Sequence, residues 1–110
     1  MKTLAMIIEY LGNFPDLQLQ STDTEEKQDP WIDKYDNDRT HYIPYTQATF
    51  VINISSNKVK EETLLAGLLE RLTDWEYVSV LNAHSERKTE TDEHGTGSHL
   101  EVKLVVKIEA

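Results

Sequence analysis

The sequence predicts an α+β fold: a two-layer sandwich in which two helices cover one face of a mostly antiparallel sheet of about four strands, with a long C-terminal hairpin. Residues 100–108 alternate apolar and polar side chains, the period of a half-buried strand. Leucines between residues 65 and 72 recur at helical spacing. The predicted order, helix, strand, loop, strand, helix, strand, turn and strand, is typical of helices packed on one face of an antiparallel sheet.

The N-terminal segment is predicted to form a short amphipathic helix. Leu4, Ile7 and Leu11 share one helical face, and Gly12 stands where a helix commonly ends. Glu9 interrupts the apolar run before it reaches the length of a signal peptide's hydrophobic region. We therefore expect a cytoplasmic protein without a membrane partner.

The next segment combines a short strand with an acidic loop. Residues 17–20 alternate over a length that predicts only a short edge strand. Residues 21–39 are rich in charge and turn formers, so we expect an acidic loop, of a length typical of functional or disordered segments, within a single domain spanning residues 1–110. Trp31 and Tyr35 would share a face if a helical turn formed there. Asp36 and Asp38 resemble part of a calcium loop, but the central glycine is missing, which favours a solvated acidic loop.

A strand and a helix follow this loop. Residues 48–54 predict a central strand with Phe50 facing the core. Ser56 and Asn57 offer an N-cap for a helix whose buried stripe is leucine-rich. Glu61 lies in the first turn of this helix, where the helix dipole favours negative charge, and we expect it on the solvated face. Trp75 and Tyr77 are expected to cap the core, and residues 77–81 begin another strand.

Residues 82–98 are predicted to form the outer part of a projecting hairpin, because their only apolar side chain is Ala83. Arg87 and Lys88 make a basic spot there, within an otherwise acidic protein. We expect this spot and the acidic loop to form head-to-tail contacts between copies. The candidate protein-interface residues are Trp31, Tyr35, Asp36, Asp38, Arg87, Lys88, Glu90 and His94.

Composition and motifs argue against catalysis and nucleic-acid binding. The formal net charge is −9, whereas binders of the phosphate backbone need clustered Lys and Arg. The chain has no cysteine, which excludes disulfides and thiolate sites. The four histidines match no metal-binding spacing, and no nucleophile elbow or phosphate loop is present in the sequence. We expect no enzyme activity, no cofactor and no metal.

The order of segments resembles the tail terminator or tail completion proteins of long-tailed bacteriophages and related prophages. The matching features are the opening helix followed by Phe14-Pro15-Asp16-Leu17, the strand 48–54 shortly after Pro44, the leucine-rich helix, and the closing pair around residues 81–91 and 100–104. The resemblance implies a non-enzymatic structural protein, present in the cytoplasm during assembly and then in the virion. It further implies an oligomeric ring, commonly a hexamer, that caps the tail tube and meets tail-tube or head-completion proteins.

An acidic protein-binding inhibitor or regulator of the nucleic-acid-mimic type is the alternative. Such a protein offers carboxylates to a basic groove. The acidic residues here are interleaved with Lys27, Lys34 and Arg39, which interrupts the continuous stripe that a mimic needs.

Overall fold

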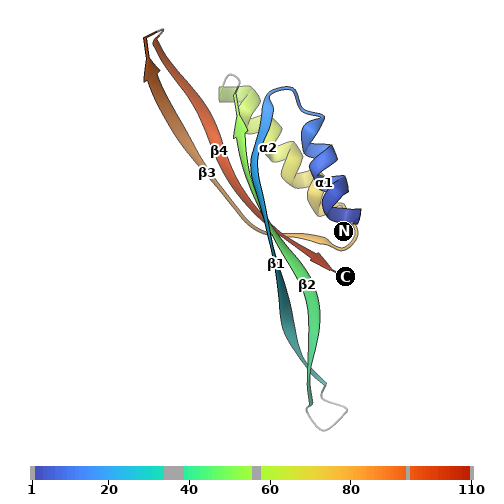
Figure 1. Ribbon diagram of the computed structural model, residues 1–110. Helices are drawn as coiled ribbons and strands as arrows, with labels where there is room; N and C mark the ends of the chain where they lie inside the picture. The colour runs from blue at the N-terminus through green and yellow to red at the C-terminus, as the bar shows by residue number, and fades with distance from the viewer. Residues whose placement is uncertain (1, 34–38, 56–57, 94, 110) are drawn as a thin grey trace.

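The computed structural model describes residues 2–33, 39–55, 58–93 and 95–109 (Figure 1). The elements, in chain order, are α1 (Lys2–Gly12), β1 (Leu17–Asp33), β2 (Arg39–Ile54), α2 (Lys58–Thr73), β3 (Val78–Asp92) and β4 (Gly95–Glu109). Within these described ranges, neither helix has the length and apolar character needed to cross a membrane.

The four strands form one open antiparallel sheet in the order β1-β2-β4-β3. Two hairpins, β1–β2 and β3–β4, are joined through the pairing of β2 with β4. Both helices lie on the same side of this sheet (Figure 1). The predicted two-layer α+β sandwich, its two covering helices and its C-terminal hairpin are therefore confirmed.

The core lies between the helices and one face of the sheet. Because side chains alternate along a strand, every second residue of β2 and β4 points toward the helices. In β2, Phe50 and Ile52 are completely buried, and in β4, Val102 and Leu104 are as well. The facing pattern predicted for both strands is confirmed. The helices contribute Ile7, Leu11, Leu68 and Leu72, and the remaining buried apolar residues are Leu17, Ala48, Ile54, Val78, Leu100, Val106 and Ile108.

The prediction of a loop was wrong for residues 21–33 and for Arg39, while residues 34–38 of the predicted loop lie outside the described residues. β1 continues to Asp33 and pairs with β2 along its whole length, and β2 begins at Arg39 rather than Ala48. Pro30 is compatible with this pairing because β1 is an edge strand, where a missing N–H group costs least. Trp31 pairs in register with His41, so the expected helical turn is replaced by extended backbone. The predicted contact residues Tyr35, Asp36 and Asp38 lie outside the described residues.

The two aromatic residues at the end of α2 behave differently from each other. Trp75 is half-buried and packs against the Tyr10 ring, with the ring centroids 5.6 Å apart. Tyr77 is 56% exposed, and its φ of 68° places its backbone in the left-handed region of a tight turn. The expectation that Tyr77 caps the core was wrong, because this turn aims its side chain away from the sheet's buried face.

The sheet extends into two ribbons that make the molecule long and narrow, with extents of 67 × 23 × 22 Å. β2 and β4 pair only between the Tyr45–Glu109 row and the Ile54–Leu100 row. Beyond these rows each hairpin is two-stranded. We call residues 28–33 and 39–44 the first arm, and residues 88–92 and 95–99 the second arm. The arms project from opposite ends of the sheet (Figure 1).

Candidate functional site

The first arm exposes large apolar side chains on a two-stranded ribbon. Tyr42 is 63% exposed and Ile43 is 52% exposed. As neighbours on one strand they point to opposite sides of the ribbon. An isolated two-stranded ribbon is only marginally stable in water, and exposed apolar groups on it are suited to contact with a partner. No signal in the sequence indicated that Ile43 would lie on a projecting arm.

The base of the first arm is tied to β4 by a charged contact. Lys107 donates a hydrogen bond from Nζ to Oδ2 of Asp29, and its ammonium lies 4.7 Å from the centre of the Tyr45 ring. The hydrogen bond to Asp29 raises the pKa of Lys107, the charges of Asp29 and Glu109 raise it further, and partial loss of water opposes these effects. The contact joins the arm to the open face of the sheet.

The contact between Asp29 and Lys107 predicts a dependence of stability on alkaline pH. A raised folded-state pKa means that the stabilisation is present below the ordinary lysine value of 10.5 and is lost as the pH rises through the raised value. We expect Asp29→Asn to lower the melting temperature slightly at about pH 9, and the difference from the wild type to shrink as the pH rises above the ordinary lysine pKa. Thermal melts across this range measure it. A difference that persists unchanged at the alkaline end would contradict the assignment.

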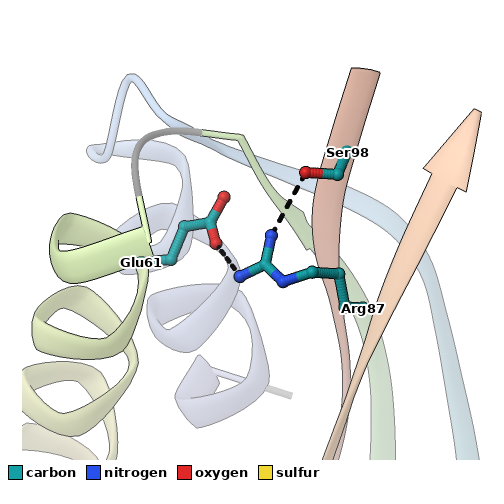
Figure 2. Close-up of polar contacts among 3 residues, drawn as sticks. All are labelled: Glu61, Arg87 and Ser98. Atoms are coloured by element: carbon teal, nitrogen blue, oxygen red, sulfur yellow. Dashed lines mark hydrogen bonds and ion pairs between the residues drawn. The ribbon is translucent and has the colours of Figure 1, made fainter. Parts of the chain in front are cut away.

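The base of the second arm holds a partly buried ion pair (Figure 2). Arg87 of β3 places Nη2 2.5 Å from Oε2 of Glu61, a residue of the first turn of α2, and its Nη1 donates to Oγ of Ser98 at 3.3 Å. Glu61 is completely buried, whereas the side chain of Arg87 is 38% exposed. Charge-assisted hydrogen bonds of this kind are stronger than neutral ones. The pair connects the helical layer to both strands of the hairpin.

The expectation that Glu61 lies on the solvated face of its helix was wrong. Glu61 stands four, seven and eleven residues before Leu65, Leu68 and Leu72, so it belongs to the helical face that meets the sheet. Glu61 is one turn before the first leucine of the stripe and contacts Arg87, which supplies the opposite charge at the root of the second arm. The spacing to the leucines was the signal in the sequence that could have placed Glu61 correctly.

The predicted basic spot is divided between the two faces of the sheet. Arg87 points to the helix side, where it pairs with Glu61. Lys88 points to the open face, where its Nζ lies 3.2 Å from Oε2 of Glu86. Arg87 is therefore engaged within the chain, which argues against its use as a free contact between copies. Lys88, which is half-buried, remains a candidate for contact between copies.

The structure separates the remaining candidate residues. Trp31 belongs to the first arm, whereas Glu90 belongs to the second arm and pairs in register with Gly97. His94, near the tip of the second arm, lies outside the described residues. Trp31 and Glu90 therefore lie in arms at opposite ends of the sheet. A head-to-tail contact between copies would have to bring together different ends or different edges of the two molecules.

The sheet has two long outer strands, β1 and β3. Since every neighbouring pair is antiparallel, β1 runs in the same direction as β4, and β3 runs in the opposite direction. Each outer strand carries a bulge, between Leu19 and Ser21 in β1 and between Val80 and Asn82 in β3. Outer strands present unpaired backbone groups that can pair with another strand.

No cluster of three or more His, Asp or Glu side chains suited to a metal ion occurs in the part of the chain that the structure describes. Comparison of the chain with protein-family models, curated proteins and solved structures finds no match.

Proposed function

We propose that this protein is a non-enzymatic structural protein of phage or prophage tail assembly, which forms an oligomeric ring that caps or joins the tail tube. The element order, helix, hairpin, helix and hairpin in two layers, agrees with the fold that the sequence resemblance implies. Two arms that project far from a small core suit a protein whose role is contact with neighbours.

The opposite directions of the two outer strands carry this proposal. When copies are related by rotation about an axis along the strands, β3 of one copy meets β1 of the next in antiparallel orientation. This head-to-tail contact uses two different surfaces, and such contacts close into rings. Pairing the outer strands also satisfies their free backbone groups. The result is a continuous antiparallel sheet with all helices on one side.

The arms then form two separate rims of the ring. All first arms project from one end of the assembled sheet and all second arms from the other. Each rim offers a repeated contact to a ring or tube above or below it. Tail-tube and head-completion proteins are the partners that this arrangement suits, and six is the copy number that the resemblance implies.

The alternative function, an acidic inhibitor of a basic protein, has one supporting observation. Asp23, Glu25 and Glu26 are all exposed on β1, at one edge of the sheet. However, Glu25 lies 3.8 Å from Lys27, and Asp29 is paired with Lys107. These cations reduce the negative potential of the strand. An inhibitor would be a stable monomer or dimer whose binding weakens steeply with salt.

Substitution of the exposed apolar residues of the first arm tests whether this arm takes part in assembly. In the proposed ring the first arms form one rim, so we expect Tyr42→Ser with Ile43→Ser to raise the concentration at which rings associate through this rim at least about tenfold, because a few large side chains carry most of the energy of a protein contact. Light scattering over a concentration series measures the mass. The melting temperature should change little, because both side chains are mostly exposed.

A matched control uses the exposed polar residues of the same arm and edge. Gln28→Ser with Thr40→Ser leaves both apolar anchors in place and should assemble as the wild type does. If the two double variants assemble equally well, the first arm is not a contact. If the wild type stays a monomer or dimer and binds basic proteins in a salt-sensitive way, the protein is an acidic inhibitor and the proposed ring is wrong.

A further inference from the structure

The second arm leaves the body of the protein at a defined row of the sheet. β4 pairs with β2 as far as Leu100, and Arg87 is the residue of β3 opposite Leu100. Ser98 lies two residues before Leu100 in β4, inside the second arm, and pairs in register with Thr89. The boundary between the four-stranded body and the two-stranded ribbon therefore falls between Leu100 and Ser98.

The guanidinium of Arg87 spans this boundary. One of its nitrogens contacts Glu61 in the first turn of α2, and the other donates to Ser98 in the arm (Figure 2). The planar guanidinium presents its donors in a fixed geometry, so its two contacts restrict the direction of the ribbon relative to the helix. The contact acts at the root of the arm, where a small change in angle produces the largest displacement of the tip.

The buried carboxylate makes this contact directional and persistent. A carboxylate taken out of water requires an opposite charge or hydrogen-bond donors, and Glu61 is completely buried. Hydrophobic packing would hold the arm without fixing its angle, because it has no preferred direction. Two-stranded ribbons also have little stability of their own, which leaves their orientation to the contacts at their base.

We propose that Glu61, Arg87 and Ser98 form a positioning device that fixes the direction of the second arm for contact with a partner. Arg87 is the central positioning residue, and Glu61 anchors it to α2. This proposal is independent of the ring proposed above, because it concerns the geometry of the arm within one chain.

A distance measurement between the arm and α2 tests this proposal. The chain has no cysteine, so spin labels can be attached at Glu70→Cys on α2 and Glu93→Cys at the arm tip, both exposed positions. We expect Glu61→Met with Arg87→Met to widen the distribution of distances between the two labels about twofold, because the arm takes more positions relative to α2 while the body stays folded. Amide hydrogen exchange in residues 88–92 and 95–99 should accelerate at least about tenfold.

The double substitution is chosen so that the body of the protein stays folded. Apolar side chains of similar volume leave no unpaired buried charge, and such replacements of buried ion pairs are commonly tolerated. The matched control is Glu86→Met with Lys88→Met, which removes the ion pair on the open face at the same level of β3. This control should keep the narrow distribution and the slow exchange of the wild type.

Three results would overturn the proposal. The first is a double variant of Glu61 and Arg87 with the distance distribution and exchange rates of the wild type. The second is equal widening in the control, which would indicate general loosening of the ribbon. The third is loss of the body's fold in the double variant, since the pair would then serve overall stability rather than arm position.

Discussion

Arg87→Met is expected to lower the free energy of unfolding by about 3 kcal/mol. The substitution removes the cation that faces the buried carboxylate of Glu61, and removing one partner of such a pair costs more than the net worth of the contact itself. The value is at the lower end of the usual range because the Arg87 side chain is 38% exposed, so water can partly replace it. Chemical denaturation measures the change, and a chain of this size should melt about 12 °C lower.

The neighbouring cation provides the control for Arg87. Lys88→Met removes an equal charge from the adjacent residue, but its contact with Glu86 is exposed and should contribute less than about 1 kcal/mol. Equal losses for the two variants would contradict a special role of the partly buried pair. By the same reasoning, Arg87→Glu would place a second carboxylate beside Glu61, so this charge reversal would disturb the fold as well as any contact between copies.

Phe50→Ala is expected to cost about 4 kcal/mol of unfolding free energy. Phe50 is completely buried in the centre of β2, the strand that pairs with both β1 and β4. Its removal creates a cavity between the sheet and both helices, and the paired strands on either side limit how far the core can collapse into it. Denaturant unfolding measures the loss, which is a large part of the stability of an ordinary small domain.

Val51 supplies the comparison for Phe50. Its side chain points to the open face of the same strand and is only half-buried, so Val51→Ala should cost about 1 kcal/mol. A smaller loss for Phe50→Ala than for Val51→Ala would place the core on the other face of the sheet.

The amphipathic segments were the predictable part of the fold. In β4 and α2, the spacing of apolar residues alone defines the buried face, because a packed core imposes its period on the sequence. Leu104 and Leu68 illustrate this: both were predicted to face the core and both are buried. The order of these segments was sufficient for the two-layer α+β architecture.

The long extension of β1 could not be predicted in the same way. Residues 21–33 run along the edge of the sheet and into the first arm, and no side chain of residues 21–30 is buried, so the segment shows no apolar period. Its acidic and turn-forming side chains also have low strand propensity. Their strand conformation comes from pairing with β2, a tertiary effect. An exposed two-stranded ribbon and a charged loop have similar sequences, because both are rich in polar side chains and lack an apolar period.

The partly buried ion pair was missed for a related reason. A glutamate in the first turn of a helix is usually exposed to water and interacts favourably with the helix dipole. This general rule predicted an exposed Glu61, although Glu61 is aligned with the leucine stripe. Its partner lies 26 residues away on β3. Only the three-dimensional arrangement brings Glu61 beside Arg87 and relates both to the second arm.

Disulfide trapping between outer strands tests the ring most directly. Asp23→Cys in β1 is combined in turn with Asn82→Cys, His84→Cys or Glu86→Cys in β3, all exposed positions on the open face of a chain that has no other cysteine. Several partners are needed because closed sheets are staggered, and disulfides require Cα atoms within about 7 Å. The proposed head-to-tail contact predicts that one combination gives a ladder of covalent oligomers ending at the ring size, whereas each single cysteine gives none. Covalent dimers from a single cysteine, or a chain that stays monomeric in every combination, would contradict it.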